Sequence, residues 1–376
     1  MLGLCARAGL ASLGTIAIDG TKIGSDAALD ANRSASAIRA EVDRVMAEAR
    51  SADEEAQPTL AGELPEDLAR PGTRRARLQA ALAEIEAQRA EADRSAAKAE
   101  AEAAQGRKLR GRKPSDPHAA ARRAEADVVA AKTKAASAKG AKAQQRAAEK
   151  VAAAEQAAEA ARRAAEAAPP PAEAKANTTD PQSRIMKTAS GWVQGYNAQA
   201  AVNDGQVVVA AEVTQDRNDA NQLVAMMEAV ASSAAAAGIG EAVGTVLADA
   251  GYWSEANATA DGPDRLIATT KDWKQRKAAR DLGTTQGPPP REATPLEAME
   301  HRLRTPEGAA AYALRSCTVE PAFGQAKENR GVRRFMRRGL AAAQSEWSLV
   351  CATGNILKLF THAQGRSLSA VVTPLL

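Results

Sequence analysis

The pattern of apolar and polar residues divides the chain into distinct kinds of sequence. Residues 14–23 alternate isoleucine with small and polar residues, which predicts a short strand that ends at Asp19. Residues 31–168 are instead rich in alanine, glutamate, arginine, lysine and glutamine, a composition typical of long helices. Larger apolar residues recur at helical spacing over residues 78–85, and elsewhere alanine alone forms the apolar stripe. We therefore expect a thin helical hairpin or coiled coil without a packed core.

The pattern changes again near residue 191, where short apolar runs alternate with turns. Strands are predicted at residues 191–202, 207–213, 242–252 and 264–270. The first two form a hairpin, and the third ends at Asp249. A helix is predicted over 216–238, with Asn218 or Asp219 as its cap, and the chain is mainly helical from residue 296 onward. This order predicts a mixed α/β fold in which a long helical insertion follows the first strand.

Three regions follow from these patterns. Residues 1–30 contain the first strand, residues 31–176 form the alanine-rich helical insertion, and residues 177–376 contain the rest of the α/β domain with its C-terminal helices. Aromatic side chains make up 3% of the chain, and none of them lies in the first 191 residues. Because large side chains dominate core energetics, we do not expect the insertion to be a well-packed globular domain.

Several classes of protein are disfavoured by composition. No apolar run approaches the length of about 18 residues that a membrane span requires, so we expect no membrane association. Cys5, Cys317 and Cys351 fit no zinc spacing and no disulfide framework, which favours a cytoplasmic location. The chain has only three histidines, which gives little support to histidine-based metal sites or to Ser-His-Asp catalysis.

Charge is unevenly distributed along the chain. Residues 301–376 contain eleven lysines and arginines against four aspartates and glutamates, a local net charge of +7 within a total of +4. A basic segment on an otherwise near-neutral chain favours a polyanionic partner, most often nucleic acid.

Three carboxylates lie where apolar segments meet polar ones. Asp19 and Asp249 come at the predicted ends of two strands, and Glu320 lies near the start of a predicted helix. Carboxylate oxygens are the ligands that Mg²⁺ prefers, and two such ions can activate an attacking oxygen and stabilise a leaving one. Asp is also common in turns after strands, so spacing alone leaves an ordinary structural role open for all three.

The sequences around these carboxylates carry a more specific signal. Five segments resemble the DDE transposases of bacterial insertion sequences and occur in the order that this family uses. In total, the resemblance covers about 190 residues. The segments are AIDGTKI (17–23), 195–223, VLADAGYWSE (246–255), 318–340 and EWSLVCATGNILKLF (346–360). The resemblance implies an RNase H-like mixed sheet flanked by helices. It also implies that Asp19, Asp249 and Glu320 chelate two Mg²⁺ or Mn²⁺ ions.

Further residues match features of the same family. Asp180, before the hairpin, is an accessory acid or the first ligand in place of Asp19, and the strand-end position favours Asp19. The candidates for a Tyr-Arg-Glu-Lys signature of related transposases are Tyr312, Arg315, Glu320 and Lys327. The spacing from Arg to Glu is one residue longer here, whereas Lys327 keeps its seven-residue offset from Glu320. An Asp-Pro turn is the ordinary reading of Asp180.

A run of basic residues follows Glu320. On a continuous helix they would form one stripe suited to phosphate neutralisation, unless Gly331 interrupts it, and Lys327 would lie on the face of Glu320. A solvated helix face is the alternative. The predicted DNA-binding residues are Lys327, Arg330, Arg333, Arg334, Arg337 and Arg338.

The resemblance implies a nucleoid-associated transposase that cleaves transposon ends and joins them to target DNA as a homodimer or higher oligomer. The family has an upstream helical region that helps to recognise the ends, and here the chain begins almost at the first catalytic strand, so we expect an N-terminally truncated copy. Two alternatives remain open. One is an inactive relic that binds DNA or a full-length transposase, and the other is a structural coiled-coil protein.

Overall fold

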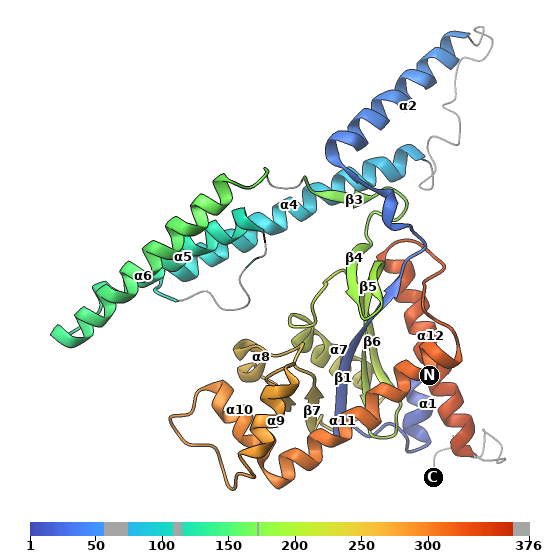
Figure 1. Ribbon diagram of the computed structural model, residues 1–376. Coiled ribbons are helices and arrows are strands. Elements are labelled where there is room, and N and C mark those ends of the chain that lie inside the picture. Colours follow the sequence, from blue (N-terminus) through green and yellow to red (C-terminus); the bar gives the residue numbers. More distant parts are fainter. Residues whose placement is uncertain (56–73, 108–113, 115, 171–172, 364–376) are drawn as a thin grey trace. The chain divides into compact units, whose positions relative to one another are not determined.

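The computed structural model describes residues 1–55, 74–107, 114, 116–170 and 173–363. The chain divides into two compact units, which are described separately here (Figure 1). Unit 1 comprises Met1–Asn32 and Asn177–Leu376, and unit 2 comprises Arg33–Ala176.

Unit 1 is built on a mixed sheet of six strands. The strands are β1 (Thr15–Gly24), β4 (Arg184–Thr188), β5 (Gly191–Asn203), β6 (Val208–Thr214), β7 (Thr245–Ala248) and β8 (Asp264–Ile267). Their order is β4-β5-β1-β7-β8, and β6 also pairs with β5. β1 is antiparallel to β5 but parallel to β7, and β8 is parallel to β7. The prediction of a mixed α/β fold is confirmed.

The range predicted for the first strand, residues 14–23, agrees with β1, but Asp19 does not lie at its end. β1 continues to Gly24 and does not end at Asp19, because β5 pairs with it along the whole stretch from Ile16 to Gly24. It is β7 that ends there, since its last pair with β1 joins Ile18 to Ala248. Asp19 therefore lies inside a strand, at the point where one of its two neighbouring strands stops.

Helices cover both faces of this sheet. In the order of the chain they are α1 (Leu2–Arg7), α7 (Gln222–Ala236), α8 (Glu255–Thr259), α9 (Trp273–Asp281), α10 (Pro295–Arg304), α11 (Pro306–Gly324) and α12 (Leu340–Ala363). A short 3₁₀ turn, η1, spans Leu29–Ala31, and a π-helical turn, η2 (Gln325–Asn329), extends α11.

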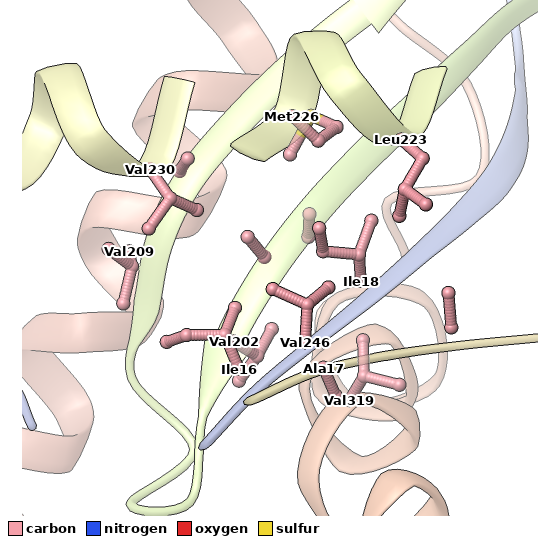
Figure 2. Close-up of a cluster of buried hydrophobic side chains, with 14 of the residues drawn as sticks. Ile16, Ala17, Ile18, Val202, Val209, Leu223, Met226, Val230, Val246 and Val319 are labelled. Carbon is pink, nitrogen blue, oxygen red and sulfur yellow. The ribbon is translucent and has the colours of Figure 1, made fainter. Parts of the chain in front are cut away.

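The core lies between the sheet and these helices. Figure 2 shows Leu223 of α7 packed toward Ile18, whereas Val319 of α11 lies beside Ala17. Neighbouring residues of a strand point to opposite faces, so β1 contributes to a core on each side of the sheet. Ile18, Ala17 and Val319 are all fully buried.

The free edge of β6 is closed by side chains of α12. Gln344 accepts from the backbone N–H of Val213 at 2.6 Å and donates to the carbonyl of Ala211 at 2.8 Å. Asn355 makes the same pair of hydrogen bonds with Val208, each at 2.8 Å. These amides replace the strand that the edge lacks, which protects it from pairing with another chain.

Unit 2 contains the helices predicted for the alanine-rich insertion. They are α2 (Ala35–Glu55), α4 (Arg74–Ala104), α5 (Pro117–Ala136) and α6 (Ala141–Glu166). The chain enters and leaves this unit through two paired strands, β2 (Asn32–Ser34) and β3 (Lys175–Asn177). A small apolar cluster joins α2 to α4 around Ile38, Leu78 and Ile85, whereas the buried residues of α5 and α6 are all alanines.

In the part of the chain that the structure describes, no helix combines the length and the apolar character needed to cross a membrane.

The alanine contact between α5 and α6 predicts weak local stability. Each buried alanine removes little apolar area at about 25 cal/mol per Å², so these helices should open more easily than the sheet. We expect amide hydrogens of α6 to exchange at least about tenfold faster than those of β1, as measured by hydrogen–deuterium exchange with mass spectrometry. α7 serves as a helical control that packs on the large core and should exchange slowly. Equal protection of α6 and α7 would contradict this expectation.

Candidate active site

The end of β7 brings Asp19 and Asp249 side by side. Ile18 and Ala248 form the last pair of the parallel β1–β7 ladder. Asp19 is the next residue of β1, and Asp249 is the first residue after β7. Each carboxylate is held by a nearby backbone amide. Asp19 accepts from Gly20 N–H at 2.8 Å, and Asp249 accepts from Gly251 N–H at 2.6 Å. The side chain of Asp19 is 19% exposed, so this carboxylate is mostly withdrawn from water.

Arg315 of α11 joins Asp19 to Glu320. Its Nη2 lies 2.6 Å from Oδ2 of Asp19, and its Nη1 lies 3.7 Å from Oε1 of Glu320. The guanidinium is 13% exposed and the Glu320 side chain is 61% exposed, so Asp19 receives the stronger, more buried contact. Thr305 caps the start of α11 through a hydrogen bond to Gly308 N–H, and Pro306 occupies the first turn, which fixes where this helix begins.

Burial and neighbouring charge disturb the titration of Asp19. Burial, together with the negative charges of Asp249 and Asp219, raises the pKa of this carboxyl to about 6, against the opposing effect of Arg315. A carboxyl group flanked by two others favours the protonated form because each additional charge repels its own. Any cation placed among these carboxylates would relieve that repulsion.

Asp219 is a third carboxylate in this group, and it does not cap a helix as the sequence suggested. The N-cap of α7 is Asn221, and no side chain makes a capping hydrogen bond there. Asp219 instead accepts hydrogen bonds from Asn197 at 2.8 Å and from Gln199 at 3.0 Å, and it forms an ion pair with Lys22 at 3.2 Å.

The polar residues beneath Asp219 are buried on the sheet. Asn197 and Gln199 of β5 have no exposed surface, and Gln199 also accepts from the hydroxyl of Tyr252. Gly20 faces the same side of the sheet as Gln199, its cross-strand partner. A Cβ at Gly20 would lie 2.2 Å from Gln199 Nε2 and 2.7 Å from Asp219 Oδ1, so only glycine leaves room for this network.

Whether the site suits divalent cations depends on its donors. Within the described residues, no three Asp, Glu, His or Cys side chains are already gathered closely enough to hold a metal ion. Arg315 accounts for this at Glu320, because its guanidinium lies between Glu320 and Asp19. The donor chemistry does fit, since carboxylate oxygens that repel one another at a sheet edge are the ligands that Mg²⁺ and Mn²⁺ favour.

Asp180 lies elsewhere on the sheet. Its carboxylate accepts from the hydroxyl of Tyr196 at 2.8 and 2.9 Å and from Gly339 N–H at 3.1 Å. Tyr196 pairs with Ile23, whereas Asp19 pairs with Ala200, so the hydroxyl that holds Asp180 comes from a residue of β5 four positions before the partner of Asp19. Burial raises the pKa of Asp180 despite these hydrogen bonds. The structure gives Asp180 an anchoring role for the segment before α12 and does not bring it to Asp19.

Tyr312 lies one turn before Arg315 on α11 and is partly buried against the core of unit 1.

The prediction of one basic helical stripe is wrong. The helix ends at Asn329, and residues 330–339 pass beside the C-terminal end of β1. There, the N–H of Gly24 donates to the carbonyl of Arg333, and the N–H of Phe335 donates to the carbonyl of Gly24. Gly331 takes a positive φ of 67°, which stops the helix directly after Arg330.

Most of the predicted DNA-binding residues have partners within unit 1. Lys327 donates to the carbonyl of Lys22 at 3.0 Å and does not share a face with Glu320 on a straight helix. Arg330 donates to the carbonyl of Val350 at 2.7 Å. The remaining ion pairs join Arg333 to Glu328, and both Arg334 and Arg338 to Asp26. Arg337 is exposed.

Comparison with known proteins matches one part of this unit. Residues 270–360 match the family model described as a transposase DDE domain. The resemblance to DDE transposases is confirmed. The matched segment contains Tyr312, Arg315 and Glu320, and it lies downstream of Asp19 and Asp249. No curated protein and no solved structure matches the chain.

Two residues near these carboxylates do not follow from the sequence patterns. The sequence favours a helix cap for Asp219 and gives no signal for Lys271, whose Nζ lies 2.9 Å from the point that a Cβ on Gly251 would occupy, where Asp249 Oδ1 lies at 2.7 Å. The sequence contains a signal for Asp219, because Asn197, Gln199 and Lys22 are polar residues within otherwise apolar strands. Buried polar side chains need partners, so their presence indicates a nearby charged group.

The raised pKa of Asp19 predicts a pH-dependent stability. A carboxyl whose folded pKa of about 6 exceeds its ordinary value disfavours the folded state when it is ionised, and this penalty disappears as the pH falls below 6. We therefore expect the stability advantage of Asp19→Asn over the unmodified chain to shrink by on the order of 1 kcal/mol between pH 7.5 and pH 5.

Tryptophan fluorescence in denaturant titrations measures this effect, because all four tryptophans lie in unit 1. Asp26→Asn is the control, because it removes the partly exposed ion pairs with Arg334 and Arg338 in the same unit. A difference between Asp19→Asn and the unmodified chain that does not change with pH would contradict the prediction.

The position of Asp180 predicts a loss of stability without a direct loss of chemistry. In Asp180→Asn, the new amide N–H₂ faces donors from Tyr196 and Gly339, which leaves a buried donor without an acceptor and costs about 1–3 kcal/mol. Thermal unfolding should show this loss. An unchanged melting temperature, or a loss of Mn²⁺ binding equal to that of Asp19→Asn, would contradict the anchoring role.

Proposed function

We propose that the chain is a DDE transposase whose unit 1 catalyses divalent-metal-dependent cleavage of transposon ends and their transfer to target DNA. The observation that carries this proposal is the β1–β7 register, which sets Asp19 beside Asp249 at the point where β7 ends. The family match over residues 270–360 adds the segment that contains Glu320. An RNase H-like assignment of the mixed sheet is part of the same proposal.

Three carboxylates would hold the metal ions. Asp19 and Asp249 would share one Mg²⁺ or Mn²⁺ ion, and Glu320 would help to hold the second. Bound in this way, the ions would supply positive charge that activates an attacking water or 3′-hydroxyl and stabilises the leaving oxygen. Glu320 is the most exposed of the three, so its side chain is the freest to move toward the other two.

Arg315 would keep the site assembled before the ions arrive. Its guanidinium neutralises part of the charge of Asp19 and holds Glu320 within 3.7 Å on the same helix. The same cation, released from Asp19, would be available to a phosphate of the bound DNA, because guanidinium groups bind phosphate oxygens in pairs.

DNA is the proposed partner, bound by transposase molecules acting as a homodimer or higher oligomer in the nucleoid. The basic segment 330–339 offers exposed guanidinium groups beside β1, and Lys271 and Lys22 add positive charge at the carboxylate cluster itself. Phosphate neutralisation by these groups would make binding steeply dependent on salt.

Glu320→Gln separates cleavage from binding. We expect this variant to lose Mg²⁺-dependent nicking of a labelled duplex by at least about a hundredfold, since an amide is a poor substitute for a carboxylate ligand. Its affinity for DNA in gel-shift assays should stay within about threefold of the unmodified chain, because removal of a negative charge does not weaken contacts with phosphates. Glu307→Gln, at the exposed first turn of the same helix, is the matched control and should retain nicking.

Two outcomes would weigh against the proposal. Full nicking by Glu320→Gln would remove Glu320 from the catalytic set. Absence of nicking by the unmodified chain, even with an upstream region supplied in trans, together with salt-sensitive DNA binding, would favour the alternative of an inactive DNA-binding relic.

A further inference from the structure

Asp219 presents one of its two oxygens to the site in a fixed direction. Its Oδ1 accepts from Lys22 Nζ, Asn197 Nδ2 and Gln199 Nε2, at 3.2, 2.8 and 3.0 Å. Its Oδ2 lies on the other side of the carboxylate, toward Gly251. Donors that hold one oxygen orient the other, and ligating carboxylates in metal sites are commonly oriented in this way.

The free oxygen of Asp219 converges with Asp249 on one small space. A Cβ on Gly251 would lie 3.2 Å from Asp219 Oδ2 and 2.7 Å from Asp249 Oδ1. The same point is 2.9 Å from Nζ of Lys271, which is an exposed residue that follows β8. Two carboxylate oxygens from separate loops therefore bound a space that a cationic head group already approaches.

A second observation is a buried acceptor without a donor on the other side of Asp219. Oδ1 of Asn197 has no hydrogen-bond donor among the residues that the structure describes, and the residue is 0% exposed. This atom lies 3.0 Å from the point that a Cβ on Gly20 would occupy, where Asp219 Oδ1 lies at 2.7 Å. A buried acceptor without a donor is unfavourable, and beside a carboxylate it adds to the negative potential that a cation would relieve.

We propose that Asp219 is a fourth acidic ligand of the site and shares a divalent cation with Asp249 in the space beside Gly251. The inference rests on the proposed function, which places a divalent cation at Asp249, and it adds a ligand that the three-carboxylate set does not contain. Before the cation binds, the ammonium group of Lys271 supplies positive charge beside this space, and it moves away when the cation binds.

A purely structural role for Asp219 makes a different prediction. If Asp219 served only to hold Lys22, Asn197 and Gln199, its replacement would lower stability without a specific effect on cation affinity. Asp216 provides the matched control, because it lies in the same loop and carries the same charge. Its carboxylate accepts from Gln222 at 2.7 Å and has no contact with Gly251.

The test is a titration of the full chain with Mn²⁺, without DNA, in which calorimetry and the electron paramagnetic resonance signal of free Mn²⁺ report binding. We expect Asp219→Asn to weaken Mn²⁺ binding at least about tenfold and Asp216→Asn to weaken it less than about threefold. Gly251→Ala changes no charge and replaces none of the three donors of Asp219 Oδ1, yet its methyl carbon would lie 2.7 Å from Asp249 Oδ1 and 3.2 Å from Asp219 Oδ2. It therefore occupies the space and should also weaken binding at least about tenfold.

The outcomes separate this inference from the proposed function. Equal effects of Asp219→Asn and Asp216→Asn, with normal binding by Gly251→Ala, would overturn the ligand role of Asp219. If Asp249→Asn still abolished Mn²⁺ binding and nicking in that case, the proposed function would stand. If Asp249→Asn changed neither, the proposed function and this inference would both be wrong. Thermal unfolding without Mn²⁺ checks each variant, and Gly251→Ala decides the matter if Asp219→Asn fails to fold.

Discussion

Asp19 and Asp249 are carried to the interior of unit 1 by the parallel pairing of β1 with β7, and their repulsion determines which residues surround them. A carboxylate withdrawn from water is unstable beside another one unless cations or donors compensate it. Arg315 provides this compensation at Asp19, and Lys22 provides it at Asp219. The pKa of Asp19 is nevertheless raised, mainly because the carboxyl is buried and in part because Asp249 and Asp219 lie nearby.

The sheet that places these charges is itself held by polar side chains from distant parts of the chain. α12 closes the edge of β6 through Gln344 and Asn355, and Lys327 ties the end of α11 to the carbonyl of Lys22. Phe323 of α11 stacks on Trp347 of α12 with ring centroids 6.0 Å apart, which joins the two helices beside the site. The C-terminal segment therefore supports the strands that position Asp19 and Asp249, and several of its basic residues have structural partners within unit 1.

Sequence patterns predict β1, β5, β6, β7 and β8, because their apolar runs are local, whereas they do not predict β4. They predict the range of the first strand but place its end at Asp19, because the strand that pairs with it as far as Gly24 is β5, which lies far away in the sequence. The sequence also contains one signal for the break after Asn329, which is Gly331. The basic run has the spacing of a helix, but Gly331 and the backbone hydrogen bonds of Gly24 with Arg333 and Phe335 override it.

Asp219 shows why a residue's local role can mislead. An aspartate just before a helix favours a cap, and only the buried amides of Asn197 and Gln199 on another element give it a different role. Such contacts depend on tertiary structure, so they cannot be read from one segment of sequence. The polar residues inside β5 were the clue that the sequence did contain.

Iron-directed cleavage of the polypeptide tests the central claim that a divalent cation binds where β7 ends beside β1. Fe²⁺ takes the place of Mg²⁺ and, with ascorbate and peroxide, produces radicals that cut the backbone close to the bound ion. Our account predicts cuts next to Asp19, Asp249 and Glu320 that excess Mg²⁺ suppresses. Cuts confined to other parts of the chain, or cuts that Mg²⁺ does not suppress, would contradict it.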